Sequence, residues 1–275
     1  MAKIAGEIDW LKTLEALVTA YEEIAAVRMQ KIRNRVLENR DFLAGLNEIF
    51  TEVKFSYKRA LVKYRLFQLK LKNGKKALVF VSANTGLYGD LIGRIFHELT
   101  GNLGSDKSEI VIIGQLGRHL FEEAYPKTPF TFFDLPDTFT DTSQTEKIKS
   151  FLLQFEEVVV YHGVFKNLVT QNIARTNITG GEETVSPASP LKTIFEPNLF
   201  AVLSYFENEA FASFLAQTLY EAQLARLSAR IAVLSQTEDN LKKSLRLAFL
   251  QKEKERHRQN NRKQLEMLAY LPLCR

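Results

Sequence analysis

The sequence predicts an α/β protein in which a central, mostly parallel α/β domain is flanked by long N- and C-terminal helices that form an antiparallel, left-handed coiled coil. Both ends of the 275-residue chain repeat apolar residues about every 3.5 positions, which is typical of paired helices. The middle alternates β-rich runs with helix-like segments, which favours a parallel sheet covered by helices. We expect an N-terminal coiled-coil helix and linker over 1–72, the α/β domain over 73–206 and a C-terminal coiled-coil helix over 207–275.

The first 56 residues are predicted to form one long amphipathic helix with two heptad registers. In the second register, Arg28 and Arg35 stand where apolar residues are expected. They either keep their charged ends at the edge of the seam or mark a place where the helix meets another protein. The first register consists of Leu11, Val18, Ala25, Ile32, Asn39, Leu46 and Val53. The second consists of Leu14, Tyr21, Arg28, Arg35, Phe42, Ile49 and Ser56.

The C-terminal region repeats in the same way, and Glu238 interrupts its apolar stripe. A sustained repeat near 3.5 keeps a seam facing its partner when the helices supercoil left-handedly, so the economical partner for each helix is the other. Because a compact middle domain brings its entry and exit points close together, the helices are expected to run antiparallel. The registers are Tyr220, Leu227, Leu234, Leu241 and Ala248, and Leu224, Ile231, Glu238 and Leu245.

The middle of the chain reads as a Rossmann-like layer. Between its elements, the segment 176–190 contains Gly-Gly and two Ser-Pro pairs without apolar periodicity, so it is predicted to be a long exposed loop. The C-terminal helix is expected to begin near Pro197 or shortly after Tyr205. The predicted strands are 77–82, 109–114 and 156–165, and the helix-like segments lie near 87–100, 115–124 and 144–155.

A glycine-containing loop follows the first predicted strand and resembles the start of many nucleotide-binding loops. It carries Gly86 and Gly89 as G-x-x-G, which fits neither the dinucleotide fingerprint nor the Walker loop. Asp90 stands near the start of the next helix, where its charge favours the helix dipole and competes with a phosphate. The loop is therefore predicted to be a structural turn, with no cofactor bound.

Composition narrows the class of protein further. The single cysteine, Cys274, allows no intrachain disulfide, so a reducing compartment is expected. The chain carries no long apolar run and is expected to be neither exported nor membrane-spanning. Its four histidines show no metal spacing, and no catalytic set is apparent. A net charge of +5 is compatible with an anionic partner.

The end of the chain combines a basic segment with an apolar tip. Residues 251–264 carry six Lys or Arg against two Glu and no apolar side chain. They form either a solvated helix face or a contact surface for an anionic partner. The apolar stretch LEMLAYLPL follows directly and suggests insertion into another protein.

The order of these parts resembles the gamma subunit of rotary F-type ATP synthases. That family carries a Ser-x-Asp-Arg-Gly-Leu-Cys-Gly loop after the first strand, in which Asn84, Thr85 and Tyr88 here replace Asp, Arg and Cys. The matching loop residues are Ser82, Gly86, Leu87 and Gly89. Further matches are Ile24, Ala25, Ala26 and Arg28 in the first helix and Arg230, Ile231, Leu234 and Asn240 in the last, with departures at Val233, Thr237 and Glu238.

This resemblance implies a non-catalytic rotor at the cytoplasmic face of an energy-transducing membrane. The implied partners are the alpha and beta subunits of the catalytic hexamer, the epsilon subunit and the c-ring, with indirect membrane association and no nucleic acid. The implied hexamer contacts are Arg28, Met29, Lys31, Arg33, Arg256, Arg258, Arg262 and Lys263, and the implied bearing tip is Leu265, Leu268 and Leu271.

Three alternatives stay open at the level of sequence. The departures from the family motifs are compatible with a divergent gamma-like accessory of a variant rotary ATPase. The basic segment 251–264 is compatible with a coiled-coil scaffold that binds nucleic acid. A small α/β enzyme with helical arms is the third alternative, and no catalytic constellation supports it.

Overall fold

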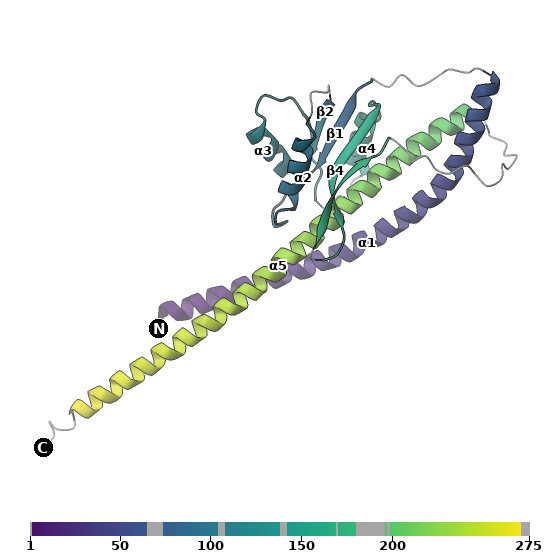
Figure 1. Cartoon of the computed structure of the whole chain (residues 1–275). Coiled ribbons are helices and arrows are strands. Elements are labelled where there is room, and N and C mark those ends of the chain that lie inside the picture. The colour runs from purple at the N-terminus through teal and green to yellow at the C-terminus, as the bar shows by residue number, and fades with distance from the viewer. Residues whose placement is uncertain are drawn as a thin grey trace. The chain divides into compact units, whose positions relative to one another are not determined.

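The computed structural model describes residues 2–64, 74–103, 108–137, 142–168, 170–179, 196 and 199–270 (Figure 1). The chain divides into two compact units. Unit 1 combines Met1–Val27 with Arg230–Arg275, and unit 2 is Arg28–Ala229.

Two long helices account for much of the chain. Helix α1 runs from Ala2 to Tyr64 and helix α5 from Leu199 to Tyr270. Neither helix contains proline, and both are rich in Ala, Leu, Glu, Lys and Arg, the residues that lose least on entering a helix. The predicted long terminal helices are therefore confirmed, and the second begins close to Pro197.

In unit 1, α1 and α5 are paired antiparallel. Thr19 near the end of the α1 part lies 3.4 Å (Oγ1 to Oε1) from Glu238, whereas the earlier Lys12 has its ammonium group over the ring of the later Phe249, 5.6 Å from the centroid. A buried apolar seam joins the helices and confirms the predicted pairing of the chain's two ends. It consists of Ile8, Leu11 and Val18 on α1 and Leu234, Leu241, Leu245 and Ala248 on α5.

The second predicted register of α1 holds at Leu14, which packs against the seam, and is wrong from Tyr21 to Phe42, while the side chains of Ile49 and Ser56 lie outside the described residues. Tyr21, Arg28 and Phe42 are exposed and Arg35 is half-buried, so this line does not form the seam. The buried line that accompanies the first register runs instead through Ile8, Glu15, Glu22, Met29, Val36 and Leu43, of which the two glutamates and Met29 are half-buried. Apolar spacing does not reveal this line in the sequence, because Glu15 and Glu22 interrupt it.

In unit 2, the same two helices pair through an apolar cluster and a polar one. Leu43 and Leu46 pack against Ala210 with Phe214 beside them. The amide of Asn39 donates to the Ser213 carbonyl and to Gln217 Oε1, at 3.2 and 2.9 Å. Arg40 pairs with Glu221 at 2.7 Å. Polar groups at seam positions fix the register of paired helices, because a shifted register would leave them without partners.

A five-stranded sheet forms the core of unit 2, in the order β3-β2-β1-β4-β5. The first four strands are parallel, and β5 is antiparallel to β4, which confirms the predicted mostly parallel sheet. Strands β3 and β5 are not among the predicted strands. The strands are β1 Lys76–Val81, β2 Ser108–Ile113, β3 Thr131–Phe133, β4 Glu157–Phe165 and β5 Gln171–Asn177.

Alternate residues of the central strands enter two separate cores, as the two-residue period of a strand requires. One face of the sheet packs against α4 (Thr142–Leu152) and buries Phe211, Leu215 and Leu219 of α5. The other face packs against α2 (Leu91–Gly101) and α3 (Gln115–Ala124), and Ala225 and Ala229 of α5 join it. One helix therefore completes both cores.

The seam assignment predicts unequal costs for two leucines of α5. Leu241→Ala should lower the free energy of unfolding of unit 1 by about 2–3 kcal/mol, because it leaves a void in the seam. Leu247→Ala is the matched control and should change it by less than about 0.5 kcal/mol, because Leu247 is 61% exposed. Guanidinium denaturation followed by the fluorescence of Trp10, the single tryptophan, measures both. Equal effects would contradict the seam.

Candidate functional site

The glycine-containing loop joins β1 to α2 and is fixed to the connection between β2 and α3. The Ser82 amide donates to the Ile113 carbonyl and the Leu116 amide donates to the Ala83 carbonyl, each at 2.8 Å. Gly114 has a φ of 103°, and a Cβ there would lie 2.8 Å from the Ala83 backbone nitrogen. A residue with a side chain at this point would push the two connections apart.

The carboxylate of Asp137 occupies the loop from the inside. It accepts hydrogen bonds from the Asn84 amide at 2.8 Å and the Thr85 amide at 2.9 Å. The Thr85 hydroxyl at 2.5 Å and the Tyr88 hydroxyl at 2.9 Å also donate to it. Successive backbone N–H groups that converge on one oxyanion form the kind of nest that binds phosphate in nucleotide-binding loops. Here the protein's own carboxylate takes that place.

Helix α5 closes the same site from another side. The guanidinium of Arg226, which is buried, donates to the Ser82 carbonyl, and Gln223 Nε2 donates to the Asp137 carbonyl at 2.8 Å. Burial alone would raise the pKa of Asp137, but the Arg226 charge and the hydrogen bonds from Thr85, Asn84 and Tyr88 outweigh it and lower the pKa below its ordinary 3.8. The carboxylate is therefore ionised at neutral pH.

The three residues that depart from the family loop belong to one network. Asn84 Nδ2 donates to Asp134 at 2.6 Å, and Asn84 Oδ1 accepts from the Gln115 amide at 2.9 Å. Thr85 and Tyr88 both donate to Asp137. These contacts are those of a structural turn, which is what the sequence predicts for this loop. Sequence reasoning missed Asp137 because it lies about 50 residues further along the chain and in no motif.

The four retained loop residues have different environments. Ser82 is buried beneath Arg226, whereas Gly86 and Gly89 are exposed. Leu87 has a φ of 70°, a left-handed conformation that costs a non-glycine residue about 1–2 kcal/mol, and its side chain is exposed. The loop therefore holds an apolar side chain outward at some conformational cost.

His162 has a structural role, because both of its ring nitrogens have hydrogen-bond partners. His162 is buried in β4, with Nε2 3.0 Å from Thr176 Oγ1 and Nδ1 3.1 Å from the Gly163 carbonyl. Burial lowers the pKa of His162 and keeps it neutral at pH 7. Among the described residues, no group of His, Cys, Asp or Glu is arranged to hold a metal ion.

The predicted hexamer-contact residues of α1 are largely exposed. Arg28, Lys31 and Arg33 face solvent, and Met29 is half-buried. At 3.6 residues per turn their spacing distributes them around the helix instead of along one face. They offer charge in several directions rather than a single patch.

The predicted contact residues of α5 are exposed and partly neutralised. Arg256 pairs with Glu253 at 3.4 Å, Arg258 with Glu255 at 3.9 Å and Arg262 with Glu266 at 3.1 Å. Lys263 is exposed as well. In the predicted tip, Leu265 and Leu268 are exposed, and Leu271 lies outside the described residues.

Helix α1 carries an exposed face of uncharged side chains in unit 1, and the sequence does not predict this exposure. Its side chains recur at heptad spacing beside the seam, against which Leu14 at the edge of the face packs. We call it the apolar face. A row of large exposed apolar side chains marks a contact surface for a partner, because it is costly to leave in water. The apolar face consists of Trp10, Leu14, Leu17, Tyr21, Ile24 and Val27, all exposed except the half-buried Leu14.

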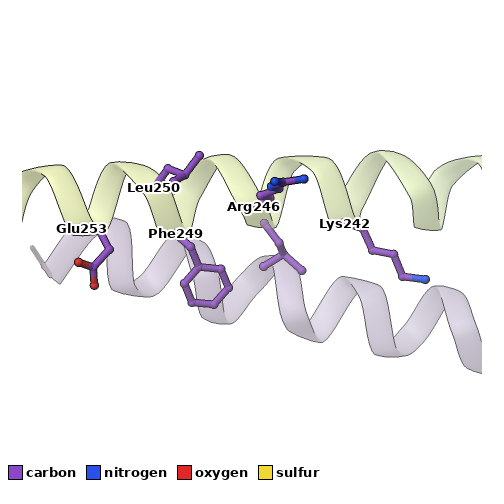
Figure 2. Close-up of a pocket in the computed structure, with 6 residues that line it drawn as sticks. Lys242, Arg246, Phe249, Leu250 and Glu253 are labelled. Atoms are coloured by element: carbon purple, nitrogen blue, oxygen red, sulfur yellow. The ribbon is translucent and has the colours of Figure 1, made fainter.

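Helix α5 carries a shallow hollow of about 420 Å³ beside the seam (Figure 2). Figure 2 shows Phe249 pointing toward the neighbouring helix, with Lys242 and Glu253 at opposite ends of the hollow. Its wall is mostly apolar and it holds no convergent polar groups of the kind that orient a small ligand. The lining residues are Lys242, Leu245, Arg246, Phe249, Leu250 and Glu253.

These features define a class of protein. Its α/β domain fills the place where related loops bind a phosphate with its own Asp137 carboxylate, and its chain also forms antiparallel helix pairs. The sequence model of the ATP synthase family matches residues 1–262, and the chain belongs to that family. The expected resemblance to the gamma subunit is thereby confirmed. No helix in the described part of the chain is long and apolar enough to span a membrane.

Curated relatives carry the name ATP synthase gamma chain. The chain is 22% identical over 269 residues to that of Amoebophilus asiaticus (strain 5a2), with 90% of each chain covered. It is 23% identical over 265 residues to that of Ruthia magnifica subsp. Calyptogena magnifica, with 90% of this chain and 91% of that chain covered.

Solved structures show the same fold. A chain of the Tetrahymena thermophila mitochondrial ATP synthase central stalk and c-ring matches with a TM-score of 0.58 and 15% identity, over 80% of this chain and 99% of that one. A chain of the Euglena gracilis mitochondrial ATP synthase assembly of OSCP, F1 and c-ring matches with a TM-score of 0.53 and 13% identity, over 90% and 94% of the two chains.

The Asp137 network predicts a pH-dependent loss of stability. Asp137→Asn should lower the free energy of unfolding by about 2–3 kcal/mol at neutral pH, because buried Arg226 loses its counter-charge. Since the folded state lowers the pKa of Asp137, its contribution is present above pH 3.8 and is lost as the pH falls through the lowered value. The two proteins should therefore converge in strong acid.

Urea denaturation across pH measures this difference. Glu123→Gln, which removes an exposed carboxylate from α3, is the control and should unfold like the unmodified chain. An Asp137→Asn protein as stable as the control at neutral pH would show that the carboxylate does not hold the loop.

Proposed function

We propose that this chain is the central rotor of a rotary F-type ATP synthase and couples ion flow through the membrane c-ring to conformational change in the alpha/beta catalytic hexamer. The observation that carries the proposal is the family match over residues 1–262, which includes helix α1, helix α5 up to residue 262 and the whole α/β domain. The similar solved structures, which include the central stalk of the Tetrahymena thermophila mitochondrial ATP synthase with its c-ring, support the same role.

The apolar face of α1 supports an enclosed helix pair. Trp10, Leu17 and Ile24 recur every seven residues and are 62, 52 and 47% exposed. The exposed Leu265 and Leu268 extend apolar surface to the end of α5. A protein that surrounds the helix pair would remove both apolar surfaces from water. Burial of these surfaces lowers the free energy, so it favours an enclosed helix pair over one exposed to solvent.

The proposed contacts follow the family arrangement. The α/β domain is assigned to the c-ring and the epsilon subunit, and the end of α5 to an apolar bearing in the hexamer. The proposed hexamer contacts are Arg28, Met29, Lys31, Arg33, Arg256, Arg258, Arg262 and Lys263, and the proposed bearing tip is Leu265, Leu268 and Leu271. Placement at the cytoplasmic face of the membrane, as a peripheral part of the complex, belongs to the same proposal.

The proposed mechanism needs a stiff rod and no chemistry in this chain. A rotating helix pair acts on the hexamer by favouring a different conformation of each catalytic subunit in turn. The seam in unit 1 and the polar cluster around Asn39 in unit 2 each resist sliding of one helix along the other within their own unit, as the transmission of rotation by the helix pair requires. The closed loop at Asp137 supports a non-catalytic subunit, because the N–H groups that would hold a phosphate are engaged.

The assembly tests the proposal directly. A tagged copy purified gently from its own membranes should give, in native mass spectrometry, one copy of this chain with the larger alpha and beta subunits. Recovery of the chain without any hexamer would contradict the rotor role. Recovery with nucleic acid would favour the scaffold alternative, although pairing of Arg256, Arg258 and Arg262 with glutamates weakens that alternative.

Two neighbouring variants test the enclosed helix pair. Leu17→Lys should lower the yield of hexamer-bound chain about tenfold or more, because a charge would be buried on the apolar face without a partner. Ala16→Lys places the same charge one residue away, on an exposed position beside that face, and should assemble normally. Both isolated chains should keep the helicity of the unmodified protein. Equal assembly of the two variants would remove the apolar face from the contact surface.

A further inference from the structure

The seam of unit 1 contains a charged layer between apolar ones. Glu238 on α5 stands between Ile231 and Leu245 in its heptad line, and Glu22 on α1 is half-buried in the line that begins at the buried Ile8. We call this group the acidic layer. Carboxylates at a helix seam are costly unless each is compensated. The acidic layer consists of Glu15 and Glu22 on α1 and Glu238 and Asp239 on α5, with Lys242 as its cation.

The one cation of the acidic layer is engaged with Glu238. Lys242 Nζ lies 2.9 Å from Glu238 Oε1, and the Thr19 hydroxyl lies 3.4 Å from the same oxygen. Glu238 is 22% exposed in its side chain and therefore faces α1 rather than solvent. The contact with Thr19 places it within one helical turn of Glu22. Two carboxylates thus approach across the seam while the ammonium group binds one of them.

The surroundings of Glu22 favour its protonated form. Desolvation raises the pKa of Glu22 above its ordinary 4.5, and the negative charges of Glu238 and Asp239 raise it further. Lys242 acts in the opposite direction and does not offset them. The hydrogen bond with Glu238, and then its charge, raise the pKa of Lys242, so this ammonium group keeps its charge at neutral pH.

We propose that the acidic layer is a proton-responsive joint: a proton taken up by Glu22 in mildly acidic solution removes a like-charge repulsion across the seam and tightens the pairing of α1 with α5 in unit 1. The proton binds the Glu22 carboxylate and no covalent bond changes. This joint is a property of the helix pair itself and does not depend on the rotor role proposed above.

The sign of the pH effect follows from linkage. Because the paired helices raise the pKa of Glu22, they bind a proton more readily than the separated helices do. Pairing therefore gains stability as the pH falls toward 4.5 and loses it as the pH rises through the raised value. A layer that served only to fix the helix register would show no such gain on acidification.

Hydrogen exchange of the full chain measures the pairing. In peptides that cover residues 8–25, the protection factor of the unmodified chain should rise about threefold between about pH 7 and about pH 5, after correction for intrinsic exchange. Glu22→Gln mimics the protonated side chain, so it should show the higher protection already at neutral pH and no further rise. Glu23→Gln removes the adjacent exposed carboxylate and should keep the unmodified response.

A second variant covers the case in which Glu22→Gln fails to fold. Lys242→Met removes the cation of the acidic layer and should steepen the rise on acidification, because Glu22 then faces Glu238 and Asp239 without opposition. The proposal is overturned if the unmodified chain shows no rise, if Glu22→Gln keeps it, if Glu23→Gln loses it equally, or if Lys242→Met leaves it unchanged.

Discussion

Helix α5 has to satisfy two different environments along one unbroken run of residues. Between Phe211 and Ala229 it is buried on nearly every side, so this stretch alternates bulky residues with alanines that allow close approach to the sheet. Between Leu234 and Ala248 a narrow stripe is buried and the rest is polar or exposed. The sheet cannot complete either core without the first stretch, and α1 has no apolar partner in unit 1 without the second.

The loop after β1 shows how a topology that often binds nucleotides can become a structural joint. Parallel strands gather their carboxyl ends at one edge of a sheet, where loops and helix N-termini usually receive an anionic ligand. In this chain the anion is Asp137 and its counter-charge is Arg226 from α5. An internal carboxylate ties the loop to the helix permanently, whereas a bound ligand could leave. That exchange suits a domain that must move as one body with a long helix.

Sequence reasoning found the features that depend on local pattern. Strands β1, β2 and β4 are apolar runs with clear ends, whereas β3 is too short and β5 too polar at the sheet edge to stand out. The first heptad register is confirmed from Leu11 to Leu46, but the second leaves the seam after Leu14, because Tyr21 belongs to the exposed apolar face. Spacing alone cannot tell a seam from such a face. Asp137 could not be found from sequence, because only the folded sheet brings it to Asn84.

The distance along the chain between paired residues also sets an order of events during synthesis. Thr19 and Glu238 are 219 residues apart, so α1 leaves the ribosome roughly 10 to 40 seconds before its partner stretch exists. The strands pair over much shorter separations along the chain. Both cores nevertheless remain incomplete until the stretch from Phe211 to Ala229 has been made. The seam side chains of nascent α1 therefore stay exposed until the stretch of α5 that covers them has been made. In the growing chain, α1 is made before the strands and acquires its partner after them, so its seam is exposed to chaperones for longer than the strands are.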